Sequence, residues 1–203
     1  MPDSRVLYIT SLVIGVMGWL AFDVAFLVKR FSSPKEASPQ TEATRRDRRS
    51  ILGILCIAAG VTLMLSLRRR PFTPIWPMSV SLQCVVALIG VLLSIAAPLL
   101  AWSAVRVLGR QWSLQARLLP DHELITSGPY RIVRHPIYTA ILSLTISIGL
   151  AVSSWPGLVG GVIFVLIGTR VRIRAEEKLL REKFAEEYAE YARRTPALIP
   201  MLV

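Results

Sequence analysis

The stretch that decides the fold is VSLQCVVALIGVLLSIAAPLLAWSAV, Val80 to Val105, which contains no charged residue. A helix needs about 20 apolar residues to cross about 30 Å of hydrocarbon. This run meets that length, and Pro98 within it marks a position where the helix could kink. The run therefore predicts a transmembrane helix.

Four other apolar runs lie on either side of it: 6–28, 51–67, 137–152 and 157–169. The first is too long for the apolar region of a signal peptide, and no small-residue cleavage site follows it. The last two are short and are separated only by SSWP, Ser153 to Pro156, which predicts a tight helical hairpin. We expect an all-α integral membrane protein with about five transmembrane helices.

The composition supports this fold class and excludes others. Of the 203 residues, 53% are hydrophobic and 18% are charged, and the mean hydropathy is +0.53. The net charge of +11 does not predict nucleic-acid binding, because the basic residues alternate with apolar runs instead of covering one soluble face. Cys56 and Cys84 lie inside apolar runs without CxxC spacing or a nearby histidine, so we expect neither a disulfide framework nor a metal site.

The basic residues also predict an orientation in the membrane. With the N-terminus outside, twenty of the 24 Lys and Arg residues fall on one side, in segments 29–50, 106–136 and 169–203. The other side holds Arg5 and the run Arg68 to Arg70. The positive-inside rule favours an outside N-terminus and a cytoplasmic C-terminus. We expect a multi-pass protein of a bacterial inner membrane or an ER-type membrane, with segment 29–50 as a cytoplasmic linker.

Polar chemistry is concentrated in the second half of the chain. The stretch GPYRIVRHPIY, Gly128 to Tyr138, places Pro136 in the first turn of a helix and His135 near its N-cap. A helix N-terminus attracts carboxylates and hydroxyl-bearing ligands. Two interpretations stay open for the flanking residues: the arginines Arg131 and Arg134 also suit headgroup anchors, and the tyrosines an aromatic belt.

The C-terminal segment predicts an amphipathic helix over 170–194. Leu180, Phe184, Tyr188 and Tyr191 recur at helical spacing, and Thr195-Pro196 ends the pattern. Near its start, Arg172 and Glu176 lie four residues apart, with Glu177 beside them. Isolated charges at the end of a membrane span are costly and usually have a partner or a ligand. An arginine there suits a substrate carboxylate, whereas a carboxylate accepts hydrogen bonds from ribose hydroxyls or an amino group.

Taken together, LGRQWSLQARLLPDHELITSGPYRIVRHPIY (108–138), RIRAEE (172–177) and FAEEYAEYARRTPALIP (184–200) resemble the isoprenylcysteine carboxyl methyltransferase family and its phospholipid methyltransferase relatives. The resemblance implies S-adenosyl-L-methionine as cofactor, S-adenosyl-L-homocysteine as product, and a membrane lipid or a lipidated, amphiphilic methyl acceptor at the cytoplasmic interface. It divides the chain into N-terminal transmembrane helices (1–105) and a cofactor-binding catalytic region (106–203), made of loop 106–136, hairpin 137–169 and tail helix 170–194.

The resemblance also assigns candidate site residues. Arg172 would hold the acceptor, with Glu176 and Glu177 completing the catalytic set. The residues expected to contact the cofactor are Gln115, His122, Glu123, Leu124, Ile125, Tyr130, His135, Pro136, Ile137, Tyr138 and Glu176. No metal is expected, because displacement at a sulfonium needs none. The resemblance leaves the acceptor open between carboxylate, amine and thiol.

The sequence departs from the family pattern at two places, and it leaves two other functions open. Thr139 and Ala140 follow RHPIY where glycine is frequent in the family. Phe184-Ala185 stands where Phe-Gly is common. One alternative is an NADPH-dependent membrane reductase of the sterol-reductase type, although such enzymes are longer. Another is a non-catalytic membrane protein that retains the fold. For a transporter, Asp23 within the first apolar run would be the candidate residue, but a hydrogen-bonded partner in the bundle would explain it equally well.

Overall fold

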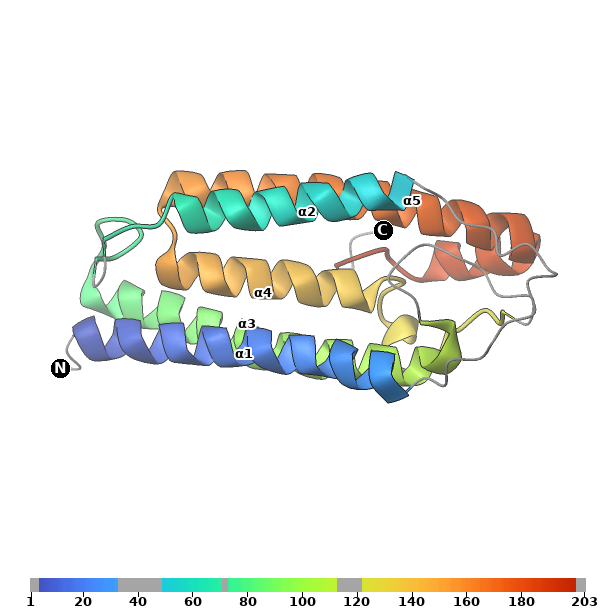
Figure 1. The fold of residues 1–203 in the computed structure, drawn as a ribbon, viewed down its shortest axis with the longest axis horizontal. Helices are drawn as coiled ribbons and strands as arrows, with labels where there is room; N and C mark the ends of the chain where they lie inside the picture. The colour runs from blue at the N-terminus through green and yellow to red at the C-terminus, as the bar shows by residue number, and fades with distance from the viewer. Residues whose placement is uncertain (1–3, 33–48, 71–72, 113–121, 200–203) are drawn as a thin grey trace.

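The computed structural model describes residues 4–32, 49–70, 73–112 and 122–199. Their regular structure is helical, with no strand in the described ranges. The helices are α1 (Ser4–Ser32), α2 (Arg49–Ser66), α3 (Val80–Leu108), α4 (Pro136–Val152) and α5 (Trp155–Arg194), with short 3₁₀ turns η1 (Gly109–Gln111) and η2 (Gly128–Arg131). Figure 1 shows the helices side by side, with α4 between the α1/α3 pair and the α2/α5 pair. The predicted all-α class is confirmed.

The exterior of this bundle is apolar. Met17, Leu55 and Leu99 are 60%, 60% and 64% exposed, which is costly in water but favourable against lipid tails. Two helices, α3 and α5, are long and apolar enough to cross a bilayer, and shorter apolar stretches lie in α1, α2 and α4. α3 is one continuous helix through Pro98.

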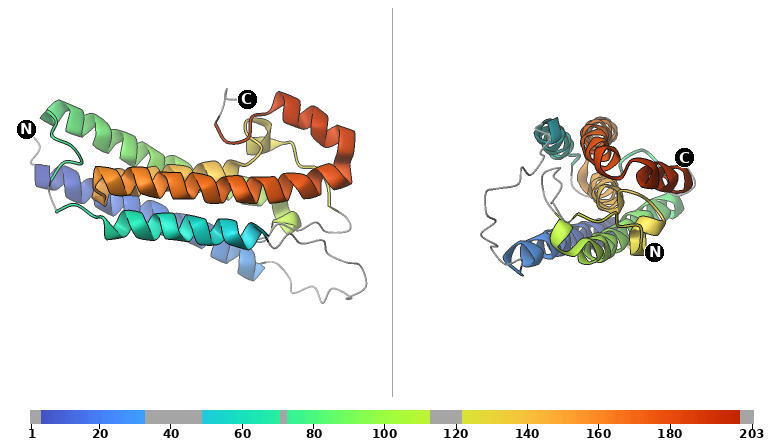
Figure 2. Two further views of the ribbon diagram at one scale, coloured as in Figure 1. Left: turned by 90° about the horizontal axis from the view of Figure 1, so that it is seen from above. Right: turned by 90° about the vertical axis from the view of Figure 1, so that its right-hand side faces the viewer.

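One predicted boundary is wrong. The sequence placed the end of the last apolar segment at 169 and a separate tail helix at 170–194, whereas α5 runs without interruption through this point. Only the polarity changes there, and no glycine or proline lies between Gly168 and Pro196 to end the helix. As a result, α5 projects past the ends of the other helices before it turns back (Figure 2).

Close packing of α2 on α5 fixes the position of this projecting helix. A Cβ atom on Gly168 would lie 2.5 Å from the carbonyl oxygen of Gly53, and one on Gly60 would lie 2.7 Å from that of Gly161. The two backbones therefore touch where glycines face each other, as in other small-residue contacts between membrane helices. α2 thus braces the segment of α5 that carries Arg172.

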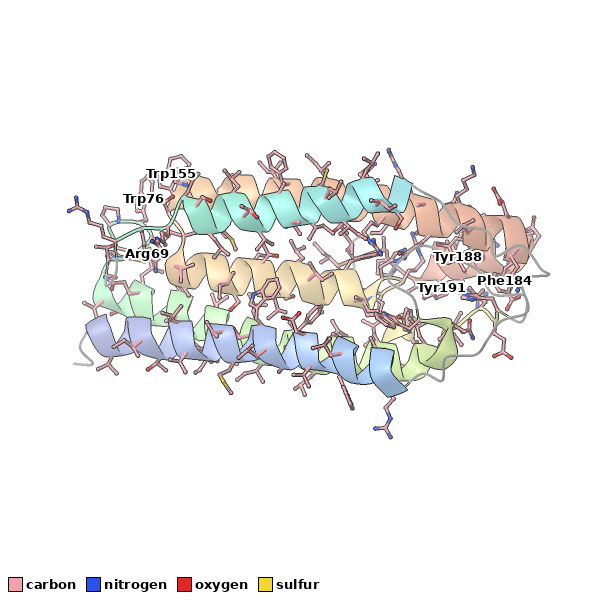
Figure 3. The ribbon with its side chains drawn as sticks, in the orientation of Figure 1. Arg69, Trp76, Trp155, Phe184, Tyr188 and Tyr191 are labelled. Atoms are coloured by element: carbon pink, nitrogen blue, oxygen red, sulfur yellow. The ribbon has the colours of Figure 1, made fainter. Side chains whose placement is uncertain are left out.

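At the end of the bundle away from the projecting part of α5, Arg69 forms hydrogen bonds with the end of α4. Its guanidinium donates to the carbonyl oxygens of Leu150, Ala151 and Ser153, at 3.0, 2.7 and 2.7 Å, at the end of α4. Trp76 and Trp155 stack edge to face nearby, with ring centroids 6.0 Å apart. Figure 3 shows these residues at the far end from Phe184, Tyr188 and Tyr191. Arg69 thus satisfies carbonyls that the last turn of a helix leaves unpaired.

Candidate functional site

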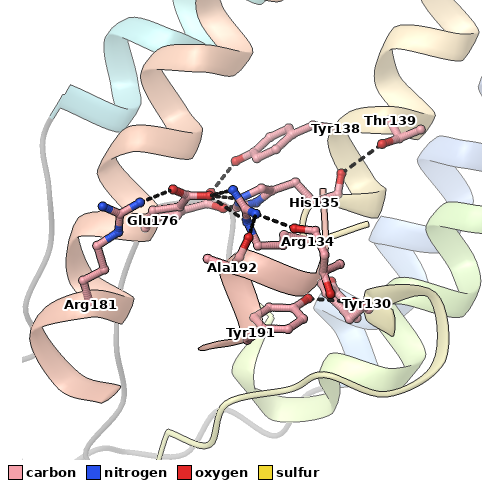
Figure 4. Close-up of polar contacts among 11 residues, drawn as sticks. Tyr130, Arg134, His135, Tyr138, Thr139, Glu176, Arg181, Tyr191 and Ala192 are labelled. Atoms are coloured by element: carbon pink, nitrogen blue, oxygen red, sulfur yellow. Dashed lines mark hydrogen bonds and ion pairs between the residues drawn. The ribbon is translucent and has the colours of Figure 1, made fainter. Parts of the chain in front are cut away.

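The candidate site lies where the start of α4 meets the projecting part of α5 (Figure 4). His135 immediately precedes α4, and Pro136 opens the helix, as the sequence predicted. Arg172, Glu176 and Glu177 come from α5. The fold therefore brings together side chains from the RHPIY and RIRAEE segments.

Tyr138 connects Arg172 to Glu176. The Nε of Arg172 donates to the Tyr138 hydroxyl at 2.7 Å, and that hydroxyl donates to Oε1 of Glu176. The Nη2 of Arg172 lies 3.6 Å from the same carboxylate oxygen, and its guanidinium carbon lies 5.4 Å from the centre of the Tyr138 ring. Arg172 is only 5% exposed, so these partners replace the water that a buried guanidinium would otherwise need.

His135 lies between the two carboxylates of the acidic pair. Its Nε2 is 3.2 Å from Oε1 of Glu177, and its Nδ1 is 3.6 Å from Oε2 of Glu176. Burial of the imidazole opposes protonation, but the two carboxylates outweigh it and raise the pKa of His135 above its ordinary value. The geometry therefore favours an imidazolium bridging two negative charges.

Glu177 is the most heavily bonded carboxylate of the site. Its Oε1 accepts from Nε and Nη2 of Arg134 at 3.1 and 3.0 Å, and its Oε2 accepts from Arg181 at 3.1 Å. Burial alone would raise the pKa of Glu177, but the contacts of His135 and the charge of Arg134 lower it to about 2. Both of its oxygens are thus committed within the protein.

Arg134 also holds the C-terminal segment, a role that the sequence left undecided between anchor and site residue. Its Nη1 donates to the carbonyl oxygens of Ala192 and Thr195, the former at 2.9 Å. The backbone amides of Arg134 and His135 donate to Pro196 and Ala197 at 2.9 and 3.0 Å. Arg131, by contrast, is exposed. The two arginines of GPYRIVRHPIY therefore differ: only Arg134 belongs to the network.

The last turns of α5 fold back over the site at a kink. Ala185 has φ 39° and ψ −109°, a positive-φ conformation that glycine adopts more easily than alanine. Beyond the kink, Tyr188 is 1% exposed, and the Tyr191 hydroxyl donates to the carbonyl oxygen of Tyr130 at 2.7 Å. Tyr130 is itself buried, which, with the nearby charge of Glu176, raises the pKa of its hydroxyl. The kink converts the aromatic face predicted for the tail into cover for the site.

The other predicted cofactor residues differ in their positions. Gln115 lies outside the described residues. Segment His122 to Ile125 is a loop at the far end of α5, where the His122 ring lies 6.4 Å from that of Phe184. Pro136 is buried and Ile137 half-buried in the first turn of α4.

Two residues that contact the site lie outside the sequence motifs. The buried carbonyl of Ser50, at the start of α2, lies 3.4 Å from Nη1 of Arg172, and Arg181 reaches Glu177 from one turn further along α5. Only the i, i+4 spacing of Glu177 and Arg181 could have indicated the second. Asp23 is exposed on α1, a position compatible with both of its interpretations.

Comparison with known proteins bears on this arrangement. The model of the isoprenylcysteine carboxyl methyltransferase (ICMT) family matches residues 88–182, a segment that contains the histidine, the tyrosine, the arginine and both carboxylates of the network. The chain is similar to this family over slightly less than half of its length. The matched segment includes the whole of α4 and α5 as far as Glu182.

Three curated relatives are similar to this chain over about half of its length. The chain is 37% identical over 102 residues to the cobalt-zinc-cadmium resistance protein CzcN of Cupriavidus metallidurans, covering 50% of this chain and 42% of that one. It is 28% identical over 115 residues to protein-S-isoprenylcysteine O-methyltransferase B of Arabidopsis thaliana, covering 56% and 58%. A third relative, at 34% identity, is the nickel-cobalt-cadmium resistance protein NccN of Alcaligenes xylosoxydans xylosoxydans, covering 50% and 43%. The chain spans about half the length of the curated relatives it matches.

Proposed function

We propose that this protein is an S-adenosylmethionine-dependent methyltransferase that methylates a membrane-embedded or amphiphilic acceptor at the cytoplasmic interface. The observation that carries the proposal is the single polar network of Arg172, Tyr138, Glu176 and His135. Its members come from two segments of the family match and meet at one end of an apolar bundle. The similarity of residues 88–182 to the ICMT family supports the reaction class.

The proposed membrane arrangement has five spans, with α4 and α5 as a hairpin and the site on the cytoplasmic side. The apolar stretches of all five helices and the two-residue connection between α4 and α5 support it. The distribution of Lys and Arg supports an outside N-terminus. An interfacial site would let a lipid acceptor arrive through the bilayer and a water-soluble cofactor from the cytoplasm.

The carboxylates of the site suit this cofactor unequally. When bound, S-adenosylmethionine supplies an electrophilic methyl group on a cationic sulfonium. Glu176 is 27% exposed, and among the described residues its Oε2 has only the 3.6 Å contact with His135, so this oxygen can accept a hydrogen bond from a ribose hydroxyl or an amino group. Glu177 has less capacity, because Arg134 and His135 hold its Oε1 and Arg181 donates to its Oε2. We therefore assign cofactor contact to Glu176 and the positioning of His135 to Glu177.

Arg172 is the residue proposed to hold the acceptor. Its Nε is fixed by Tyr138 at 2.7 Å, whereas its Nη atoms make longer contacts, 3.4 Å to Ser50 and 3.6 Å to Glu176. An anionic acceptor group would replace these weaker contacts while Tyr138 keeps the guanidinium in place. A carboxylate acceptor is already ionised at neutral pH, so the arginine needs only to orient it.

Equilibrium binding of S-adenosylhomocysteine to the purified protein in detergent tests the proposal. We expect His135→Ala to weaken binding about tenfold or more, because it removes the group between the two carboxylates. Arg172→Lys should bind the ligand like the wild type yet fail to transfer tritiated methyl groups into a lipid extract, since lysine lacks the planar fork. Arg193→Lys, at an exposed position, is the matched control. An absence of binding by the wild type would refute the methyltransferase assignment.

A further inference from the structure

A large groove runs along α5 and has Glu177 of the site network in its lining. It has a volume of about 1030 Å³, and its walls are one face of α5, Arg134 and the C-terminal residues Ala197 and Leu198. This is as large as the clefts that hold drug-sized ligands. Gly168 and Arg172 face α2 instead, so the groove lies apart from the packed side of the helix.

The groove changes from apolar to basic along its length. At one end Leu166 and Ile167 are 39% and 50% exposed, within the apolar part of α5. Immediately beyond the apolar run, Arg170, Arg174 and Arg181 continue the same wall at helical spacing. The order of these residues matches an amphiphile with its acyl chains in the bilayer and its charge at the surface.

Two of these arginines have no acidic partner among the described residues. Arg181 and Arg134 are paired with Glu177, but Arg170 and Arg174 are exposed and make no hydrogen bond or ion pair with any of the described residues. Lys178 lies 3.9 Å from Glu182 in an exposed, weak ion pair. Arg170 and Arg174 therefore place unpaired positive charge at the boundary between the apolar and basic parts of the groove.

We propose that this groove binds an anionic glycerophospholipid, with its phosphate at Arg170 and Arg174 and an acyl chain against Leu166 and Ile167. Arginine suits this role because its guanidinium binds phosphate oxygens in a bidentate manner. A zwitterionic lipid would bring an ammonium group into a groove with a net positive lining, so the site discriminates between headgroups. The inference rests on the proposed position of α5 in a bilayer but not on methyl transfer.

Native mass spectrometry of the full-length protein in detergent tests the site. The probes are phosphatidylglycerol and phosphatidylcholine with the same acyl chains. The wild type should retain phosphatidylglycerol preferentially. The double variant Arg170→Gln/Arg174→Gln should lose about 30-fold in affinity for phosphatidylglycerol, from about 1 kcal/mol for each arginine, and should lose less affinity for phosphatidylcholine, whose ammonium group offsets its phosphate. Arg193→Gln/Arg194→Gln, which removes the same charge from an exposed position at the same end, should bind like the wild type.

Any of three results would overturn the proposal. The first is equal binding of both lipids by the wild type, and the second is a loss of affinity in the control variant as large as in the groove variant. The third is complete displacement of the lipid by soluble glycerol 3-phosphate at equal concentration. The last result would indicate a site for free phosphate esters. Binding of S-adenosylhomocysteine by the groove variant should stay unchanged, so the lipid site and the methyltransferase proposal can fail independently.

Discussion

The glycine contact between α2 and α5 makes a sharp prediction about stability. In Gly168→Ala, the new Cβ would lie 2.5 Å from the Gly53 carbonyl oxygen and 2.9 Å from the backbone nitrogen of Ile57. Both obstacles are backbone atoms, so the helices have to separate. Gly160→Ala is the matched control, because on the same helix its Cβ would meet only the flexible end of Leu63, at 3.2 Å.

Comparing Gly168→Ala with Gly160→Ala isolates the effect of the backbone contact between α2 and α5. Each substitution gains up to about 1 kcal/mol of helix propensity, which cancels between the two variants. The remaining difference is the overpacking penalty, so Gly168→Ala should have a free energy of unfolding about 1–3 kcal/mol lower than Gly160→Ala. Unfolding in mixed micelles of increasing SDS content, followed by circular dichroism, measures it. Equal stability of the two variants would show that the backbones of α2 and α5 are not in contact at Gly168.

Four further predictions concern the site. Ala185→Gly should raise the free energy of unfolding by about 1 kcal/mol, because glycine adopts the positive φ of this kink more easily; a loss of stability in the same assay would contradict this. Glu177, whose pKa of about 2 lies below its ordinary 4.5, contributes stability that is present above pH 4.5 and lost as the pH falls toward 2, by about 3 kcal/mol. Glu177→Gln should therefore flatten the acid limb of stability against pH, and an unchanged limb would exclude Glu177 as its cause. His135 has the opposite sign: its raised pKa gives stability that is full below pH 6.5 and lost at higher pH, so His135→Gln should remove that alkaline loss. Tyr138→Phe should lower the free energy of unfolding by about 1–3 kcal/mol, since Arg172 and Glu176 lose their shared hydroxyl; wild-type stability would mean that water replaces it.

The departure at Ala185 illustrates how sequence and structure complement each other. The sequence showed only that alanine stands where Phe-Gly is common in the family. The structure gives a physical reason for glycine, because the chain turns back at this residue with a positive φ. The kink was not predictable from periodicity, since the surrounding residues form helices well and include no glycine or proline.

The sequence by itself determined the all-helical class and the approximate position of each helix, because apolar run length and hydrophobic spacing are local properties of the chain. The candidate site residues on α4 and α5 came from the family resemblance and stay a prediction. Only the tertiary structure decided that Arg134 is a network residue and that Ser50 on α2 contacts Arg172. It also decided that Glu177 is more fully bonded than Glu176, whose Oε2 contacts His135 at 3.6 Å. These distinctions depend on which helices approach each other and how closely, and contacts between residues 43 and 122 positions apart leave no periodic signal in a single sequence.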